Sequence, residues 1–528
     1  MPPKQRRLFL QRAALAAAAT TLPRWAWVQT AHLADDPFAL GVASGDPTPD
    51  GVVLWTRLIA PPGQPLPEQT VHWEVAHDEG FQRLVQKGQA TASPERGHSV
   101  HVEVQGLEPA RWYHYRFLLG QATSATGRTR TAPAADALVA RLRVAFASCQ
   151  RWEHGHYAAW RHLCADQPEL VLFLGDYIYE YATPKNTDGL ARTHSLRHAT
   201  TLTDYRDRYA LHKSDPALQA AHAACPWAVT WDDHEVQNDY AGGRNGQGDE
   251  GDARAFLVQR SAAWQAFYEN MPLRASSLVD AQFGQFGQLQ VYRRLRWGRL
   301  AQLHLLDDRQ YRALQACRKP GASNAGTVRP GDCAELANPA RSLLGPAQEQ
   351  WLDTGLAADA QSDRTRWSVL AQQTLFSPRH YPSGQVATDG WDGYPAARER
   401  LLQSVQRHRP RNTVLLGGDI HQNYVCNVHA PGAGASGGSL PVLASEFCGT
   451  SISSRSGTTQ DKVDAIARHN PHVLLARCEQ RGYGLADITP TRWTTTLRVL
   501  DNPMDAASTA STQARFVVED RKPGPVAA

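Results

Sequence analysis

Four stretches of the chain share one pattern of hydrophobic and polar positions, an apolar run that stops abruptly in residues able to hold a metal or a proton. The runs begin at Leu142, Leu170, Trp227 and Thr413, and they end in Ser148-Cys149, Gly175-Asp176, Asp232-Asp233-His234-Glu235 and Gly418-Asp419-Ile420-His421. Runs without alternation, separated by helical patterns such as residues 157–166, predict buried strands joined by crossover helices. Because ligands of open α/β sheets bind beyond the carboxyl ends of the strands, we expect the four ends to converge.

Residues 37–133 follow a different pattern, in which apolar and polar positions alternate over short segments such as 71–76, 99–104 and 112–117. This spacing, with turn residues between the segments, predicts an immunoglobulin- or fibronectin-like β-sandwich, which we assign to residues 36–135. The α/β pattern that starts at Leu142 is assigned to a second domain at residues 140–510. Residues 511–528 are assigned to a C-terminal tail, of which residues 517–528 are expected to be frayed.

The first residues have the composition of an export signal. Arg6 and Arg7 form a twin-arginine pattern, and a short, weakly apolar segment follows at residues 13–22. That segment is too short to span a bilayer. We therefore predict a twin-arginine signal peptide at residues 1–34, export by the twin-arginine translocation machinery to the periplasm or the extracellular space, and no stable membrane anchor.

Residues 1–30 also explain the formal net charge of +4, because without their five basic residues 50 basic side chains remain against 51 acidic ones. A nearly neutral body gives no electrostatic footprint for general nucleic-acid binding, so no specific nucleic-acid partner is expected. We expect a monomer.

The eight cysteines of an exported protein suggest disulfide bonds. Cys317 and Cys333 flank a loop rich in Pro, Gly and Asn and form the best candidate pair, and Cys426 and Cys448 form a second candidate pair. Cys149 ends an apolar run, where it is either a free metal ligand or a small buried hydrophobic residue.

The end of the run that starts at Thr413 is the most informative single motif. Two glycines allow the backbone to turn tightly, so the carboxylate of Asp419 and the imidazole of His421 then point toward one place. Because the other three runs also end in possible ligands, the pattern predicts a metal site rather than four unrelated strand ends.

These strand ends, with further motifs, resemble the PhoD-like alkaline phosphatases and phosphodiesterases, a branch of the calcineurin-like metallophosphoesterases. The motifs are residues 38–47 with 53–57, 147–150, 175–181, 231–235, 306–311, 391–394 with Arg398, and 417–421. The resemblance covers nearly the whole chain after the signal. It implies an α/β fold, a four-layer αββα metallophosphoesterase sandwich behind the N-terminal β-sandwich, with iron, Fe(3+), and calcium, Ca(2+), in the site.

The chain also departs from common metallophosphoesterases. Their Asp-x-His motif is replaced by Ser148-Cys149, and their Gly-Asn-His-Glu by Asp232-Asp233-His234-Glu235, which favours the PhoD branch. Asp308 stands where that family more often has Thr.

Within this resemblance each ionisable residue receives an expected role. Asp176 bridges two metals, because the two oxygens of a carboxylate diverge; Cys149, Tyr179 and His421 complete the iron site with anionic and imidazole donors. Calcium takes hard oxygen donors from Asp232 or Asp233, Asn238 and Asp419, with Asp233 favoured over Asp232.

Four more residues are expected near the substrate. His234 hydrogen-bonds the phosphate or protonates the leaving alkoxide, unless it only supports a ligand. Arg309, which we count with His234 and Asp176 among the catalytic residues, lines the substrate end with Arg398 and Trp391, unless these groups form ion pairs or pack.

The expected function is that of an exported, metal-dependent hydrolase of phosphate monoesters and diesters at alkaline pH, in which a metal-activated hydroxide attacks phosphorus. One alternative is a dedicated secreted phosphodiesterase, comparable to a phospholipase D, that acts on nucleic-acid, lipid or teichoic-acid diesters; the near-neutral charge disfavours a nuclease. A secreted binding protein without activity is a weak third alternative, because all four strand ends keep their ionisable residues.

Overall fold

The structure is a computed structural model that describes residues 36–60, 64–246, 253–282, 285–319, 322, 325–361, 365–432 and 440–528. The signal peptide expected at residues 1–34 lies outside the described residues. Within the described part of the chain, none of the helices combines the length and the apolar character needed to cross a bilayer.

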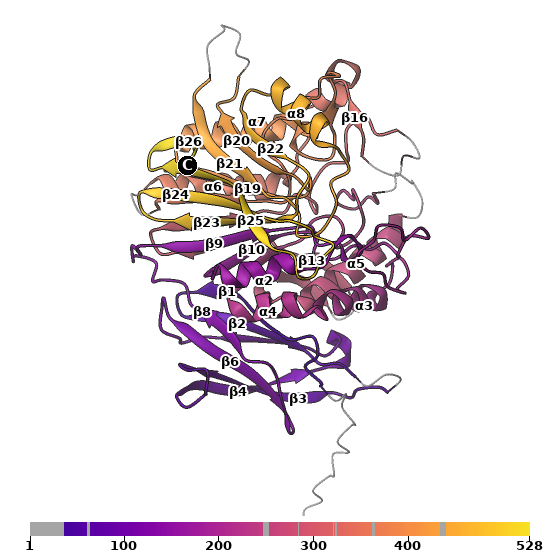
Figure 1. The fold of residues 1–528 in the computed structure, drawn as a ribbon, viewed down its shortest axis with the longest axis vertical. Helices are drawn as coiled ribbons and strands as arrows, with labels where there is room; N and C mark the ends of the chain where they lie inside the picture. Colours follow the sequence, from indigo (N-terminus) through magenta and orange to yellow (C-terminus); the bar gives the residue numbers. More distant parts are fainter. Residues whose placement is uncertain are drawn as a thin grey trace, which may run out of the picture.

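The larger of the two main sheets has ten strands (Figure 1). In spatial order they are β26 (Lys522–Ala527), β25 (Ala510–Glu519), β24 (Arg492–Leu500), β23 (Gly482–Ile488), β9 (Leu142–Ala147), β10 (Leu170–Leu174), β11 (Trp227–Thr230), β1 (Val42–Thr48), β2 (Gly51–Arg57) and β5 (Ser99–Val104). Strands β9, β10, β11 and β1 run parallel, and the other pairs are antiparallel. Three of the predicted apolar runs therefore form adjacent strands at the centre of this sheet.

The second main sheet has seven strands and contains the fourth predicted run. Its spatial order is β14 (Arg293–Trp297), β15 (Ala301–Leu305), β17 (Trp367–Ala371), β19 (Thr413–Gly417), β21 (Val442–Cys448), β20 (Asn423–His429) and β22 (Val473–Arg477). Strands β15, β17, β19 and β21 run parallel. The two sheets share one apolar core, to which Leu172 and Phe146 contribute from the first sheet and Val369 and Leu416 from the second.

Alternate residues of the central strands face helices instead. On β10, Val171 and Phe173 belong to a second core with residues of α2 (Ala158–Ala165), α3 (Leu202–Lys213), α4 (Pro216–Ala224) and α5 (Ala253–Asn270). Residues of α6 (Gly345–Ala360) and α7 (Pro395–His408) pack with Leu370 and Leu415 of the second sheet, and α8 (Gln460–His469) packs against β22. The helix predicted at residues 157–166 is α2.

The N-terminal region is rich in β-structure, but it is not a closed unit. Its five-stranded sheet is formed by β3 (Gln69–Ala76), β4 (Leu84–Ala92), β6 (Trp112–Leu119), β7 (Ala122–Thr123) and β8 (Gly127–Arg130). Its other strands, β1, β2 and β5, extend the ten-stranded sheet, because β1 pairs in parallel with β11. Short pairs complete the fold, β12 (Leu278–Gln282) with β13 (Gln285–Leu289), and β16 (Thr327–Val328) with β18 (Val386–Ala387).

The expectation of a tail at residues 511–528, frayed over 517–528, is wrong. These residues form most of β25 and all of β26, which add to the edge of the ten-stranded sheet beside β24 (yellow in Figure 1). Phe516 and Val518 alternate toward the core between the sheets and are nearly inaccessible. The segment looks polar in the sequence because only one face of these antiparallel strands packs against the core and needs apolar residues.

The cysteines give one correct and one wrong prediction. Cys317 and Cys333 form a disulfide with Cα atoms 5.9 Å apart. Cys426 and Cys448 are both free and buried, so the second predicted pair is wrong. They lie on neighbouring strands, but Cys426 is opposite Glu446 and Cys448 is opposite Tyr424. Diagonal neighbours in a sheet are about 7–8 Å apart, which is too far for a disulfide.

Candidate metal centre

The ends of β9, β10, β11 and β19 meet where the two sheets face each other. The segment after β9 is tied to the segment after β10, because the Cys149 amide donates to the Gly175 carbonyl at 3.0 Å. At Gly418, after β19, a Cβ would lie 2.3 Å from Ser148 Oγ. A glycine is therefore required where the end of the second sheet approaches the first, and the predicted convergence of the four ends is confirmed.

Several candidate ligands have left-handed backbones. The φ angles are 59° at Cys149, 57° at Asp176, 63° at Asp419 and 56° at His421. A residue with a side chain pays a free-energy cost in this region, and such residues gather where function requires a side chain to point in a particular direction. At each of these positions the backbone turns shortly after a strand, and this turn directs the side chain into the space between the strand ends.

The first group of donors contains Cys149, Asp176 and His421, whose ligand atoms all lie within 4.8 Å of one another. The Tyr179 hydroxyl joins them, 2.9 Å from Asp176 Oδ2 and 3.2 Å from His421 Nε2. Cys149, Asp176 and Tyr179 are at most 3% exposed. The four residues that the resemblance assigns to iron are therefore brought together.

His421 is oriented as a ligand. Its Nδ1–H donates to the Arg455 carbonyl at 2.8 Å, which leaves Nε2 directed at the donor group. Burial, together with nearby cationic groups, lowers the pKa of His421 to about 3, so the imidazole is neutral and its Nε2 lone pair is available. A carbonyl that fixes the tautomer in this way is the usual partner of a metal-binding histidine.

The second group contains Asp176, Asp233 and His234, so Asp176 belongs to both groups. His234 Nδ1–H donates to Glu180 Oε2 at 2.7 Å. Burial disfavours the imidazolium, but the carboxylates of Glu180, Asp176 and Asp233 outweigh burial and raise the pKa of His234 to about 10. His234 is therefore a proton donor within reach of the shared carboxylate.

Arg309 decides which of the two neighbouring aspartates is available. It is a fully buried arginine whose Nε bonds to Asp232 Oδ1, while its Nη1 lies 3.7 Å from Asp233 Oδ2. Each of the two has one buried carboxylate oxygen without a hydrogen-bond partner, but Asp233 lies in donor groups, whereas Asp232 lies in none of the donor groups among the described residues. These positions favour Asp233 as a ligand over Asp232.

The residues expected at the substrate end have structural partners. Arg309 also contacts Asp389 at 2.7 Å and Asp419 at 3.6 Å. Arg398 pairs with Asp392 at 2.5 Å, and Trp391 is 1% exposed in the core under α7. For all three residues the structure shows the ion-pair or packing alternative.

The last two predicted ligands lie at the edge of the groups. Asp419 accepts from Thr374 Oγ1 at 2.7 Å and remains 23% exposed, outside the donor groups found among the described residues. Asn238 is half-buried, and its backbone N–H donates to Glu180 Oε1 at 2.9 Å. Glu180 thus holds both His234 and the Asn238 segment.

Several residues of the centre were missed in the sequence. Asp239 and Asp389 form a third group with Asp233. Burial and the neighbouring carboxylates raise the pKa of Asp239 to about 7. Both were visible as polar residues next to quoted motifs, but the sequence gives no reason to bring them together, because Asp389 lies 150 positions after Asp239 and outside any strand end.

The loop after β21 was also missed. Its Ser454 Oγ lies 2.8 Å from the Tyr179 hydroxyl and 2.9 Å from the Cys149 carbonyl. Arg481 Nη1 donates to the Ser454 carbonyl at 2.5 Å and holds this loop in place. The signal was weak, because Ser445 and Glu446 interrupt the apolar pattern of β21 and no strongly ionisable residue follows its end at Cys448-Gly449-Thr450.

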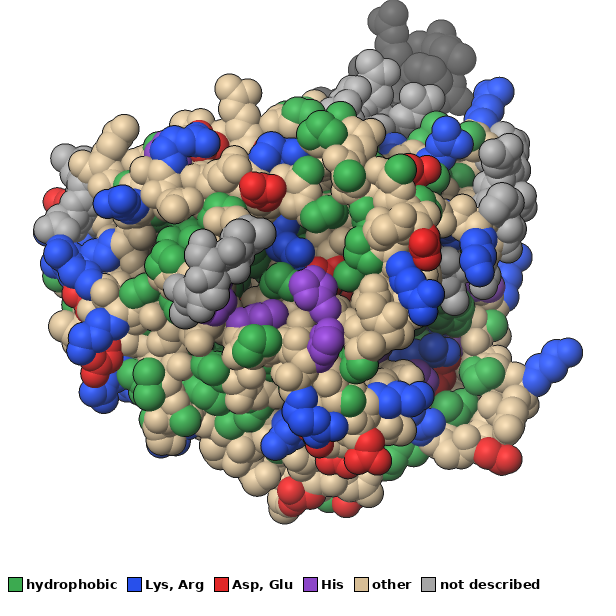
Figure 2. Space-filling view, turned by 90° about the horizontal axis from the view of Figure 1, so that it is seen from above, with side chains coloured by type: hydrophobic (Ala, Val, Ile, Leu, Met, Phe, Trp, Pro, Cys, Tyr) green, Lys and Arg blue, Asp and Glu red, His purple; other side chains and the backbone are tan. Residues whose placement is uncertain are grey.

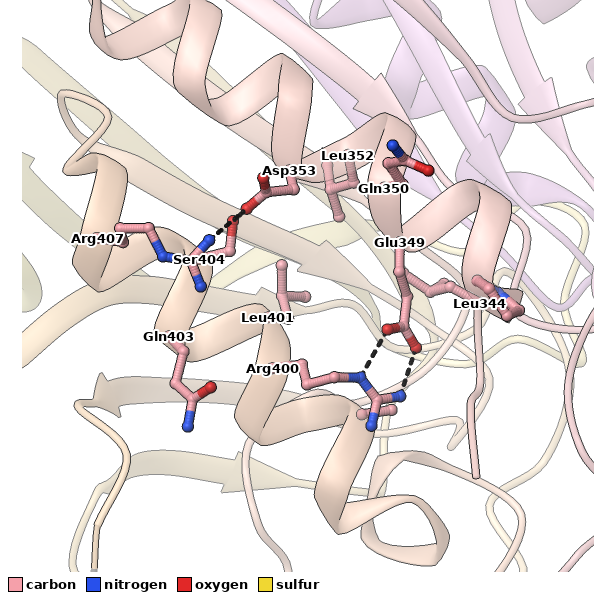
Figure 3. Close-up of a pocket in the computed structure, with 12 residues that line it drawn as sticks. Leu344, Glu349, Gln350, Leu352, Asp353, Arg400, Leu401, Gln403, Ser404 and Arg407 are labelled. Carbon is pink, nitrogen blue, oxygen red and sulfur yellow. Dashed lines mark hydrogen bonds and ion pairs between the residues drawn. The ribbon is translucent and has the colours of Figure 1, made fainter. Parts of the chain in front are cut away.

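Some cavities lie away from the centre. One of about 450 Å³ lies between α6 and α7, where Glu349 and Arg400 form a two-fold ion pair (Figure 3). None of the candidate ligands lines it. On the face shown in Figure 2, the described basic and acidic side chains are interspersed rather than separated. The centre is thus recognised by its donor atoms and not by the size of a cavity.

The donor set fits bound cations. Burial, followed by the Asp176 charge, raises the pKa of the Cys149 thiol well above its ordinary value. Burial likewise raises the pKa of Asp176, to which Asp233, Glu235 and Asp419 add. Packing this many buried acids together is unfavourable unless cations offset them, and a bound metal reverses such shifts. The unpartnered Asp233 Oδ1 is one atom such a cation would satisfy.

Comparison with known proteins agrees with this geometry over almost the whole chain. A family model described as PhoD-like phosphatase matches residues 144–497, and one described as PhoD-like phosphatase, N-terminal domain, matches residues 23–133. The chain is 43% identical over 500 residues to alkaline phosphatase D of Bacillus subtilis strain 168, covering 92% of this chain and 82% of that protein. It is also similar to a solved structure described as the structure of PhoD, with a TM-score of 0.84, 42% identity, and coverage of 93% of this chain and 92% of that one.

Proposed function

Since the chain belongs to the PhoD-like phosphatase family and is a phosphoesterase, we propose that it is an exported, metal-dependent hydrolase of both phosphate monoesters and diesters. Phosphatases of this family depend on metals, and the described residues contain matching donor groups. One observation carries the proposal, namely that Asp176 belongs to two donor groups of different composition. A carboxylate in that position can bridge two cations, as hydrolysis of a phosphate ester by a pair of metals requires.

The ligands divide by donor chemistry. Cys149, Tyr179 and His421, with Asp176, suit Fe(3+), because thiolate and phenolate are strong anionic donors. Asp176, Asp233, Asn238 and Asp419 suit Ca(2+), which prefers oxygen ligands; Asp232 takes part if Arg309 releases it. When bound, the cations would neutralise charge on the phosphoryl oxygens and acidify a water molecule.

The chain's own residues supply the proton and the alignment. His234 carries the proton that the leaving alkoxide needs, and Glu180 holds the imidazole by its Nδ1–H, so that Nε2–H is the donating group. Arg309 orients Asp232, Asp233 and Asp419 from within the core. Ser454 fixes the Tyr179 hydroxyl. Arg309 thus contributes to catalysis by positioning carboxylates.

We also propose that the chain from residue 140 onward, with β25 and β26 included, forms a four-layer αββα sandwich behind an immunoglobulin- or fibronectin-like region at 36–135. The core between the two main sheets and the helices on their outer faces support the layering. The continuity of β1, β2 and β5 with the ten-stranded sheet argues that the two regions fold as one unit.

The decisive experiment is metal analysis of the purified, exported protein together with its activity on p-nitrophenyl phosphate and bis(p-nitrophenyl) phosphate. We expect one iron and at least one calcium per chain, a visible charge-transfer band from the phenolate, and hydrolysis of both esters. Calcium chelation should inactivate the enzyme reversibly. Colourless, active protein that holds only zinc would overturn the metal assignment, and cleavage of the diester alone would identify a dedicated phosphodiesterase.

Export has its own test. Replacing Arg6 and Arg7 together by Lys should retain the precursor in the cytoplasm, because the two side chains are not interchangeable where a paired guanidinium is recognised. Normal periplasmic or extracellular activity of this variant would show that the chain uses another route.

A further inference from the structure

Two arginines that the proposed chemistry does not use stand beside the Cys149 side of the centre. Arg151 follows the end of β9, and Arg455 lies in the loop after β21. The two segments are joined, because the Arg151 amide donates to Ser454 Oγ at 3.0 Å and Ser453 Oγ donates to the Arg151 carbonyl at 2.8 Å. Both arginines are therefore held by the same pair of loops that holds Tyr179.

The Arg151 guanidinium lies over aromatic rings at the centre. Its Cζ is 5.7 Å from the centroid of the Tyr179 ring and 5.1 Å from that of Tyr181, and the Tyr181 ring in turn contacts His234. Nε donates to Glu153 Oε2 at 3.3 Å, while Nη1 and Nη2 have no hydrogen-bond partner among the described residues. The side chain is 18% exposed, so part of it is accessible from outside.

Arg455 is attached to the other side of the same group. Its carbonyl accepts from His421 Nδ1 at 2.8 Å, and its amide donates to His154 Nδ1 at 3.2 Å. The side chain is exposed and reaches the Gly189 carbonyl with Nη2. Arg455 therefore orients the candidate ligand His421 through its backbone carbonyl and also carries an exposed guanidinium group.

The charged groups that act on His154 are mostly cationic. Burial, followed by Arg151 and Arg455, lowers the pKa of His154 to about 4. The nearby acid is Glu153, which also lies 3.3 Å from His194 Nε2 and is therefore shared. This contrasts with the carboxylates around Arg309 and is unusual beside a centre whose ligands already attract cations.

We propose that Arg151 and Arg455 form a subsite for a second anionic group, carried on an organic arm of the phosphate ester, so that the enzyme favours esters bearing a further phosphate. The subsite rests on the proposed function, since the reacting phosphate is placed by Asp176 and its neighbours. Two arginines suit this ligand because their planar, permanently charged groups form paired, charge-assisted hydrogen bonds with phosphate oxygens.

A matched pair of substrates tests the subsite. Thymidine 5′-(p-nitrophenyl phosphate) and its 3′-phosphorylated derivative release the same p-nitrophenolate, so only the second anion differs between them. For the wild type we expect the derivative to have the higher kcat/KM, mainly through KM. Arg151→Gln or Arg455→Gln should each reduce that preference about tenfold, the size of one charge-assisted hydrogen bond, and Arg→Lys at either position should retain part of it.

Arg492→Gln, an exposed arginine at the far end of β24, is the matched control and should leave the preference unchanged. Equal losses on both substrates in the Arg151 and Arg455 variants would place these arginines on the reacting phosphate and overturn the subsite. A wild-type enzyme that shows no preference between the two diesters would also overturn the subsite but would leave the proposed function intact. If neither diester is cleaved, the diesterase part of the proposed function fails instead. The ratio of kcat/KM values is then measured with glycerol 1,3-bisphosphate and glycerol 1-phosphate. Absence of a preference between these two monoesters again overturns the subsite.

Discussion

On one side of Asp176 lie a thiol, a phenol and an imidazole, from Cys149, Tyr179 and His421, whereas the other side is built almost entirely from carboxylates. The carboxylate side contains its own cation, because the buried Arg309 contacts four aspartates. The donor set of the thiol side contains no cationic group. Arg151 and Arg455 lie beside these donors but are not among them.

The difference in donor chemistry is the basis for proposing two different metals at one centre. Soft and anionic donors favour a transition metal, whereas hard oxygens at flexible distances favour calcium. Arg309 stabilises the carboxylate side, and removing one partner of such a buried pair leaves an uncompensated charge. The thiol and phenol avoid this cost because they are neutral when no metal is bound, their pKa values being raised above ordinary by burial and by Asp176.

The largest expected effect comes from removing the residue that the two sides share. Asp176→Asn should abolish turnover and lower the content of both metals, because one carboxylate serves both donor groups. Metal analysis and p-nitrophenyl phosphate hydrolysis of the purified variant check this. Loss of only one metal would mean that Asp176 belongs to one side and does not bridge.

His234→Ala should separate proton donation from metal binding. We expect the variant to keep its metals and lose roughly 10²–10⁴-fold in kcat, with a smaller loss for esters whose leaving groups need little protonation. Rates on p-nitrophenyl and alkyl phosphates, with metal content beside them, provide the measurement. A variant that loses metal as Asp176→Asn does would make His234 a ligand instead.

The pH profile sharpens the same prediction. The imidazolium donates a proton, so activity should fall as pH rises through the His234 pKa, which is about 10 with its three carboxylates unneutralised. Cations bound at Asp176 and Asp233 would lower this pKa but leave the contribution of Glu180. Glu180→Gln should therefore move the alkaline limb of the kcat profile to lower pH, and a limb that stays in place or moves up would contradict the assignment.

Cys149→Ser should affect one side only. Losing the thiolate should weaken iron binding and diminish the visible band, while calcium content and the fold are retained, because several other ligands remain. Cys426→Ser is a matched control, a buried free cysteine outside the donor groups. Equal loss of both metals from Cys149→Ser would show that the two sides do not bind independently.

The smallest effect on the centre should come from the disulfide, which belongs to neither side. Replacing Cys317 and Cys333 together by Ser removes a disulfide that joins residues 16 positions apart in the sequence. We expect a loss of about 3 kcal/mol in the free energy of unfolding, visible as a lower Tm, with the iron-to-calcium ratio unchanged. A changed ratio would tie this surface loop to the centre.

The sequence by itself determined the strands that carry the centre and most of its donors. Uninterrupted apolar runs have little choice but to be buried strands, and their polar ends then lie at one edge of a parallel sheet. It also identified Cys317 and Cys333, since they close a loop of ordinary length. It failed at residues 511–528, because antiparallel strands with one solvent-facing side have a weak hydrophobic pattern.

Only the tertiary structure decided the rest. Arg309, which comes from the other sheet, holds Asp232, and Asp233 rather than Asp232 joins the donor groups. Asp389, Ser454 and the pair Arg151 and Arg455 reach the centre through loops that no periodicity describes. Local patterns fix what must be buried, but contacts between residues hundreds of positions apart are fixed by how the two sheets pack, and it is this packing that divides one pocket into two chemically different sides.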